Sequence, residues 1–236
     1  MSRPTRALQN ELSTTIQVYV SLATPDLEVM VFSRRFFVAG SLLGMSSAAL
    51  SRTVLEQAPA SAAASHPGVA PGLLERALHA LDQHRDSVAH RDFIGVADFS
   101  LHSRTRRFHL VNLADGSVRS HLVAHGRGSD PTHTGWLERF SNEPRSNATS
   151  AGAYLTGAFY AGAHGHSMRL DGLDPTNSNA ASRAIVVHGA WYVSEAMIGH
   201  SGMLGRSEGC LAVASSSLDE VMSTLGPGRL IYADRA

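Results

Sequence analysis

The sequence predicts a mainly β domain of the α+β class, preceded by a segment that does not belong to it. Short apolar and β-branched runs, separated by turn residues, recur from residue 93 to the end of the chain. Helical periodicity is confined to residues 72–85 and 215–225. The first 64 residues have the composition of a leader rather than of a domain. We therefore expect a single β-rich domain with flanking helices.

The first element expected is an amphipathic helix over residues 72–85. Apolar residues recur there at spacings of three and four, at Leu73, Leu74, Ala77, Leu78 and Leu81. Pro71 stands near the first turn, where a helix does not need the missing N–H group. This helix should pack on the outside of the core.

Seven runs then have the composition of strands, and a helix lies between the last two. The strand-like runs cover residues 93–99, 107–113, 118–124, 154–160, 167–170, 184–187 and 229–233. Residues 114–117 form the turn of a hairpin. Ser217 is a plausible N-cap, with Asp219 and Glu220 in the first turn of the helix and Gly226 near its end.

The N-terminal segment resembles an export signal. Arg34 and Arg35 form a twin-arginine pair, and an uncharged, mostly apolar run follows over residues 38–50, too short to cross a bilayer stably. Small residues between 58 and 64 offer cleavage sites. We expect residues 1–64 to be an extension and signal peptide and residues 65–236 to be a domain exported to the periplasm or cell envelope. The alternatives are a retained anchor helix and a true start at Met30.

Composition excludes several classes of function. All 20 basic residues are arginine, so lysine Schiff-base chemistry, the P-loop lysine and a Ser-Lys dyad are impossible. Residues 65–236 hold 15 arginines and 16 carboxylates, which leaves no broad basic field for nucleic acid. With one cysteine, no intramolecular disulfide can form, and Cys210 is an unpaired thiol.

The candidate site joins this thiol to a histidine. His188 and Gly189 follow the apolar run 184–187, where a core strand would emerge. Cys210 follows the turn-like residues 205–209, whose backbone N–H groups could bind an oxyanion. An imidazole that takes the thiol proton would permit thiolate acyl chemistry. The alternative is a cysteine buried as a small apolar residue.

The wider pattern resembles a known family. His188 and Gly189, a spacer of 17 residues, and the run Ser207-Glu208-Gly209-Cys210 resemble the signature of the YkuD-type L,D-transpeptidase catalytic domain. The similarity extends upstream through residues 123–129, 140–142, 150–154 and 164–173. The resemblance implies a β-sandwich or barrel-like core with flanking helices. It implies an enzyme that acts on peptidoglycan stem peptides and requires no cofactor. We also expect a monomer and, because the apolar run is short, no stable membrane span after cleavage of the signal.

The resemblance also implies the role of each motif residue. Cys210 would be the nucleophile and His188 the general base, held by the backbone carbonyl of Gly189, while Gly209 contributes to the oxyanion site. Glu208 departs from the family pattern, which has histidine at its position, and Ala212 stands where Arg or Asn is common. We expect Glu208 to pair with Arg206 or Arg169. The expected substrate-binding residues are His166, Arg169, Arg206, Ser207 and Glu208.

Two further features have alternative interpretations. Residues 126–152 are rich in Gly, Ser, Asn and Pro and form either a floppy insertion or a structured wall of the active-site cleft. We expect the wall, because the family-like pieces lie at both ends. His164 and His166, taken with His188, could suggest a metal site, but their loose spacing leads us to expect none.

Three functions remain open at this stage. The transpeptidase would form 3-3 cross-links from tetrapeptide stems through a thioester. An L,D-carboxypeptidase or stem-peptide hydrolase would use the same thioester with water as the acceptor. A non-catalytic wall-binding module would keep the fold without turnover.

Overall fold

The structure, a computed structural model, describes residues 68–236. The expected signal peptide, its paired arginines and its cleavage site lie outside the described residues. The helical elements are α1 (Pro71–Gln83), α2 (Glu195–Ser201), η1 (Ser215–Ser217) and α3 (Leu218–Leu225). The strands are β1 (Phe93–Asp98), β2 (Phe108–Asn112), β3 (Val118–His121), β4 (Val123–Ala124), β5 (Gly152–Gly162), β6 (Gly165–Gly172), β7 (Val186–Ala190), β8 (Leu211–Ala214) and β9 (Leu230–Asp234).

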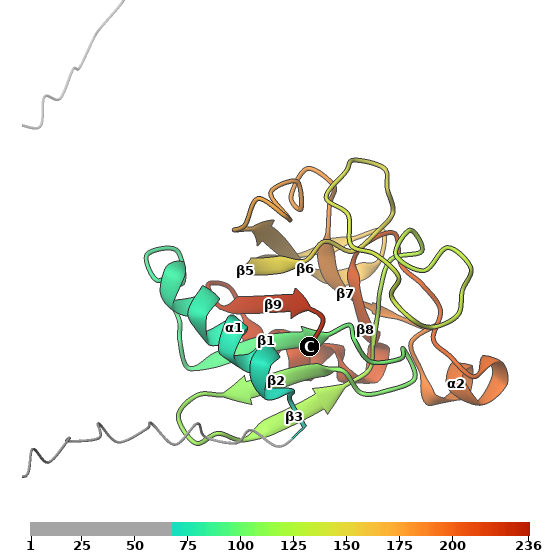
Figure 1. Cartoon of the computed structure of the whole chain (residues 1–236), viewed down its shortest axis with the longest axis horizontal. Helices are drawn as coiled ribbons and strands as arrows, with labels where there is room; N and C mark the ends of the chain where they lie inside the picture. Colours follow the sequence, from blue (N-terminus) through green and yellow to red (C-terminus); the bar gives the residue numbers. More distant parts are fainter. Residues whose placement is uncertain (1–67) are drawn as a thin grey trace, which may run out of the picture. The chain divides into compact units, whose positions relative to one another are not determined.

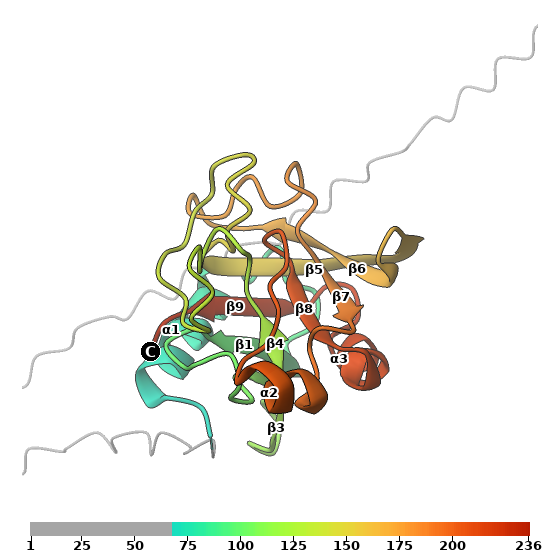
Figure 2. The ribbon, with the colours of Figure 1, turned by 90° about the vertical axis from the view of Figure 1, so that its right-hand side faces the viewer.

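The strands form one sheet that curls back on itself. Its order is β3-β2-β1-β9-β5-β6-β7-β8-β4. The first and last strands, β3 and β4, are separated in the chain by Leu122 alone, so the two ends of the sheet are joined by continuous chain. Figures 1 and 2 show β9 and β1 between the β5–β6 hairpin and the β2–β3 pair. The mainly β, barrel-like fold with flanking helices is confirmed.

Two helices cover opposite faces of β1. Leu73, Ala77 and Leu81 of α1 pack on Ile94 and Val96 and bury the outer face. Figure 1 shows α1 lying across β9, β1 and β2. Val221, Met222 and Leu225 of α3 join the main core, which contains Ala97 of β1. Apolar residues on both faces of one strand therefore hold both helices.

The element boundaries differ from those expected in ways that matter for the site. Strand β7 continues past Val187, so His188 and Gly189 lie inside a strand rather than after it. Strand β8 and helix α2 were not predicted. Helix α2 has 7 residues, too few for an apolar period to be evident; Ser194 caps it by accepting the Met197 N–H at 3.2 Å. No helix within residues 68–236 is long and apolar enough to span a membrane.

A buried polar chain connects the sheet to the long loop that follows β4. Arg107 has no exposed surface, and its guanidinium donates to the carbonyls of Leu101 and Val123 and to His125 Nδ1, at 2.8 Å for the last. Arg107 can only donate, so Nδ1 of His125 accepts and Nε2 carries the proton. The Nε2–H group points at Asp130 Oδ2, and the Nε2 and Oδ2 atoms lie 3.3 Å apart. Burial, with the Arg107 charge, lowers the pKa of His125 to about 4 and keeps its ring neutral.

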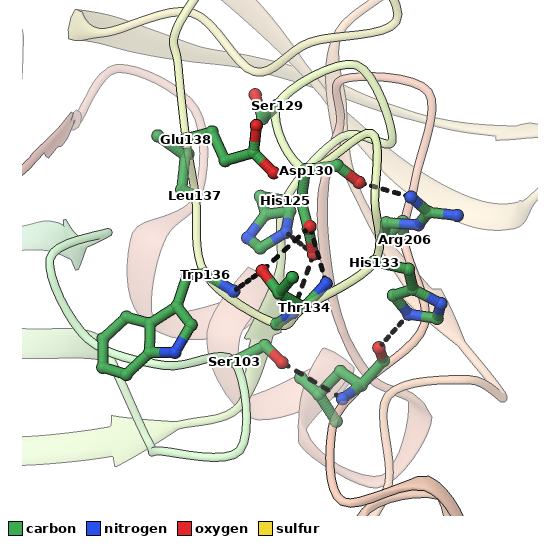
Figure 3. A network of polar contacts seen from close by, with 12 residues as sticks. Ser103, His125, Ser129, Asp130, His133, Thr134, Trp136, Leu137, Glu138 and Arg206 are labelled. Atoms are coloured by element: carbon green, nitrogen blue, oxygen red, sulfur yellow. Dashed lines mark hydrogen bonds and ion pairs between the residues drawn. The ribbon is translucent and has the colours of Figure 1, made fainter.

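Asp130 anchors the long loop that follows β4. Its carboxylate accepts the backbone N–H groups of Thr134 and Gly135 at 2.8 and 2.9 Å, in addition to the His125 ring. Figure 3 shows these contacts converging on the carboxylate, with the Arg206 side chain reaching the same segment. Burial raises the pKa of Asp130, but these hydrogen bonds outweigh it and leave the pKa below its ordinary value. Residues 126–137 are therefore a structured segment.

Replacing Arg107 by methionine tests how much this buried polar chain of side chains contributes to the stability of the fold. We expect Arg107→Met to lower the free energy of unfolding by about 3 to 5 kcal/mol, because the buried carbonyls and His125 lose their only charged donor. Urea unfolding followed by circular dichroism measures the change. Arg104→Met is the matched control, since Arg104 is exposed. Equal stability of the two variants would show that the buried guanidinium contributes nothing.

Candidate active site

Two neighbouring parallel strands bring His188 and Cys210 to one face of the sheet. His188 lies in β7 and is in register with Ala212 of β8. Cys210 immediately precedes β8, two residues before Ala212. Side chains two residues apart in a strand share a face, so the thiol lies on the imidazole's side, one diagonal step away. Among the described residues, no hydrogen bond joins the two groups directly.

The His188 ring is held in one orientation by its own strand. Its Nδ1 lies 3.0 Å from the carbonyl oxygen of Gly189, the contact that the sequence led us to expect. A carbonyl only accepts, so Nδ1 carries the proton and the lone pair is on Nε2. Burial lowers the pKa of His188, although the Gly189 hydrogen bond opposes this effect. A buried neutral imidazole with a free Nε2 is suited to accept a proton.

The Cys210 thiol is protonated at rest. Burial is the main reason that its pKa is raised, the Val186 N–H lowers it, Glu208 raises it, and Arg183 lowers it. The sulfur lies 3.6 Å from the carbonyl oxygen of Ala184, to which the S–H can donate. Ala184 has φ of 54°, an uncommon conformation for a residue with a side chain. A thiol of this kind needs a base before it can act as a nucleophile.

The turn before Cys210 is shaped by Ser207 and Gly209. The buried Ser207 hydroxyl donates to the Cys210 carbonyl at 2.7 Å and accepts the Gly209 N–H at 3.1 Å. Gly209 has φ of 119°, and a side chain there would meet the Ala148 carbonyl at 2.9 Å. The Gly209 N–H is therefore already engaged. The Cys210 N–H, which points at its own sulfur, is the better placed oxyanion donor.

This turn interlocks with two other loops by direct backbone contact. Gly126 pairs with Ser207, whose N–H donates to the His125 carbonyl at 2.9 Å. A Cβ on Gly126 would lie 2.2 Å from the Asn147 carbonyl and 2.8 Å from Gly209 N, so only glycine fits. Three segments distant in sequence thus meet at the base of the cysteine turn.

A pocket of about 520 Å³ opens beside the sulfur. Its lining combines the thiol with cationic and anionic side chains: Pro144, Arg145, Asn147, His164, Ser182, Arg183, Ala184, Glu208 and Cys210. Arg145 and Asn147 have positive φ, as Ala184 does. Residues 144–147 form one side, so residues 126–152 include a structured wall of the pocket, as expected, and not a floppy insertion.

Arg183 ties this wall to the strand that carries His188. Its guanidinium donates to the Ser141 carbonyl at 2.8 Å, to the Ser150 hydroxyl at 2.7 Å and to the Ala148 carbonyl. It also lines the pocket, and its charge lowers the thiol pKa. Its position close to the His188 motif made it a candidate for binding a carboxylate, with a solvated surface arginine as the alternative.

The domain as a whole matches one family. A family model described as L,D-transpeptidase catalytic domain matches residues 65–233. This chain is a member of that family. No curated protein sequence matches it.

Three solved structures with low sequence identity to this chain illustrate the similarity. An L,D-transpeptidase from Mycobacterium smegmatis is 17% identical, over 61% of this chain and 58% of that one, with a TM-score of 0.38. L,D-transpeptidase 3 from Mycobacterium tuberculosis is 15% identical, over 61% of each chain, with a TM-score of 0.36. The helical cell shape determining protein Pgp2 from Campylobacter jejuni is 13% identical, over 71% and 57%, with a TM-score of 0.41. The chain spans about three fifths of the length of these structures.

The histidine beside the pocket is His164, whereas the sequence analysis favoured His166. The His164 ring stacks on His188, with centroids 4.4 Å apart and an interplanar angle of 21°, and it lines the pocket. His166 is exposed and packs edge-on against Phe159. Ser167, the next residue in β6, is paired with His188, so alternation turns His166 to the other face.

The two arginines expected to bind substrate have other contacts. Arg169 lies over the Tyr160 ring, 4.5 Å from its centroid. Arg206 donates to the carbonyls of Asp130 and Pro131 and ties the cysteine turn to the loop shown in Figure 3. Neither lines the thiol pocket. Ser207 is likewise buried in the turn rather than available to a substrate.

The expected partners of Glu208 were wrong. Its carboxylate pairs with Arg127 at 2.9 Å, because the Gly126–Ser207 contact brings residue 127 alongside the cysteine turn. Both side chains are exposed. Glu208 still lines the pocket and raises the thiol pKa. Among residues 68–236, no group of three His, Cys, Asp or Glu side chains is arranged to hold a metal ion.

Neutralising Glu208 should therefore make the thiol more acidic. In Glu208→Gln the negative charge near sulfur is lost and Arg127 is freed, and both changes favour the thiolate. We expect the pH midpoint of Cys210 alkylation by iodoacetamide to move to lower pH. The signal is unambiguous because the chain has one cysteine. Glu138→Gln, which removes a carboxylate outside the pocket, should leave the midpoint unchanged. A midpoint that stays or rises in Glu208→Gln would show that Glu208 does not oppose the thiolate.

Proposed function

We propose that this domain is a cysteine L,D-transpeptidase that acts on the tetrapeptide stems of peptidoglycan. The observation that carries the proposal is the placement of the Cys210 thiol, in an open pocket, on the same sheet face as a neutral His188 whose Nδ1 is held by Gly189. A thiol with a raised pKa and an oriented base are the two parts that thioester chemistry needs. Membership of the L,D-transpeptidase catalytic domain family supplies the substrate class.

In the proposed reaction, Cys210 forms and then releases a thioester. The S–H turns from the Ala184 carbonyl to Nε2 of His188, which takes the proton. Sulfur attacks the carbonyl carbon at the L-centre of the third stem residue, and the oxyanion is stabilised by the Cys210 N–H. The C–N bond to the terminal D-alanine breaks, and the leaving amine takes the proton from His188. An amine of a second stem then attacks the thioester, forms a 3-3 cross-link and returns the thiol.

Charged groups of the pocket would orient the stem. The Arg145 guanidinium forms no hydrogen bond or ion pair with another described residue and lines the pocket together with Arg183. Stem peptides carry carboxylates, which arginine binds bidentately. We assign the carboxylate-binding role to Arg145 in place of Arg169 and Arg206.

Purified tetrapeptide muropeptides test the proposal. Incubated with the protein and analysed by mass spectrometry, they should give cross-linked dimers with loss of D-alanine. Cys210→Ala should give no product, and His188→Ala should slow acylation by roughly 10²-fold or more, the usual scale for a general base. His166→Ala is the matched control and should retain activity, because that imidazole lies outside the pocket.

Each product pattern has one interpretation. Tripeptides alone would mean that water resolves the thioester and that the domain is an L,D-carboxypeptidase. If the wild-type protein gave no product, the remaining interpretation would be a non-catalytic wall-binding module. Full activity of Cys210→Ala would rule out the thioester mechanism.

We also propose that the domain is exported by the twin-arginine route to the periplasm or cell envelope. This rests on Arg34, Arg35 and the short apolar run after them. Replacing both arginines by lysine should leave the precursor in the cytoplasm, as measured by cell fractionation, whereas replacing Arg3 and Arg6 should not. Normal export of the Arg34→Lys, Arg35→Lys double variant would point to another route.

A further inference from the structure

A second pocket lies at the other end of the strand pair that carries His188 and Cys210. It has a volume of about 300 Å³ and shares no lining residue with the thiol pocket. Its walls come from the segment before β2, the β3–β4 junction, the β7–α2 turn and the residues after β8: Arg106, Leu122, Ala190, Trp191, Val193, Ser194, Glu195, Ala214, Ser215, Ser216 and Ser217. Nothing in the proposed reaction uses these residues.

The pocket displays an indole on a rigid turn. Trp191 is 77% exposed, the most exposed of the large apolar side chains described. Its neighbours Ala190 and Val193 are buried, and the Val193 N–H closes the turn on the Ala190 carbonyl at 3.1 Å. The Ser194 hydroxyl donates to the Trp191 carbonyl. The backbone is therefore anchored, while the ring is left open to a ligand.

The rest of the lining combines apolar side chains, such as Leu122 and Val193, with polar ones, and it carries no net charge. Arg106 and Glu195 form an ion pair at 2.6 Å, which neutralises the charged side chains of this pocket. The hydroxyls of Ser215, Ser216 and Ser217 form no hydrogen bond to other described residues, so their donors and acceptors are available. The thiol pocket, in contrast, holds Arg145, Arg183 and Glu208.

We propose that this second pocket binds a neutral saccharide, with a sugar ring stacked on Trp191. A pyranose has an apolar C–H face, which suits an indole, and a rim of hydroxyls, which suits free serine hydroxyls and a charged pair that can donate and accept. The volume lies at the small end of ligand sites and fits a ligand of one or two rings. A charged peptide would find its complement in the thiol pocket instead.

The position along β7 suggests how the two pockets are related. Trp191 follows His188 by three residues, a separation of about 10 Å in an extended chain. Peptidoglycan consists of a neutral sugar chain linked to charged stem peptides. The second pocket suits the sugar chain, and the thiol pocket suits the stem peptide. Only this relation between the two pockets rests on the proposed function, because the binding of a sugar requires no turnover.

The chain has two tryptophans, which makes the test direct. In a full-length Trp136→Phe variant, Trp191 is the only indole, and titration with chitotetraose, the β-1,4-linked tetramer of N-acetylglucosamine, should change its emission saturably. By isothermal titration calorimetry, Trp191→Ala should bind the tetramer at least tenfold more weakly than wild type. Trp136→Ala, which removes the other exposed indole, is the matched control and should bind as wild type does.

The possible results separate the proposal from the proposed function. Equal affinity of Trp191→Ala and wild type, or no saturable emission change up to the solubility limit of the sugar, would overturn the saccharide site. A free tetrapeptide stem that shifts Trp191 emission when the sugar does not would also overturn it, in favour of peptide. Trp191 is largely exposed, so its loss should not unfold the domain, which circular dichroism checks. Cys210→Ala should bind the tetramer unchanged, whether or not the wild type turns over stems.

Discussion

The arrangement of this site depends on the buried polar chain that runs from Arg107 through His125 to Asp130. His125 is its centre, because the ring joins the arginine to the carboxylate while the backbone carbonyl accepts the Ser207 N–H at the cysteine turn. One residue thereby connects the core of the sheet, the loop after β4 and the segment that presents Cys210. Buried polar groups are costly unless all are paired, so a fully paired chain of this kind holds one geometry in preference to others.

Close backbone packing completes what the polar chain begins. Gly126 and Gly209 allow two loops to approach within contact of Asn147 and Ala148, and Arg183 donates to carbonyls of the same loop. The thiol pocket is lined by the loop at 144–147, by residues 182–184 before β7 and by the cysteine turn, together with His164. Its shape therefore comes from three segments of irregular structure, each held by groups that have no direct part in the proposed chemistry.

The electrostatics of the thiol are a balance in which burial is the largest effect. Burial favours the neutral forms of both groups, raising the pKa of Cys210 and lowering that of His188. Arg183 favours the thiolate and Glu208 opposes it. In the proposed reaction, the proton would pass to His188 only when the sulfur turns toward the ring.

Sequence by itself determined the fold class, most strands, the two amphipathic helices and the pairing of His188 with Cys210 in one motif. These depend on local patterns: apolar periodicity in α1, β-branched runs in the strands, and the resemblance of residues 188–210 to a known signature. The same resemblance implied the hydrogen bond from His188 to the Gly189 carbonyl, which joins adjacent residues.

Tertiary structure alone decided which other side chains surround the thiol. His164 replaced His166 because His164 lies in the turn between β5 and β6, whereas alternation within β6 places His166 on the face opposite His188. Arg127 replaced Arg206 as the partner of Glu208 because the backbone pairing of Gly126 with Ser207 joins segments about 80 residues apart. Helix α2 and strand β8 were not predicted because the helix has only 7 residues and the strand's 4 residues were interpreted as part of the motif. Contacts between segments that are distant in the sequence depend on how the chain folds in three dimensions, and no local pattern of residues encodes them.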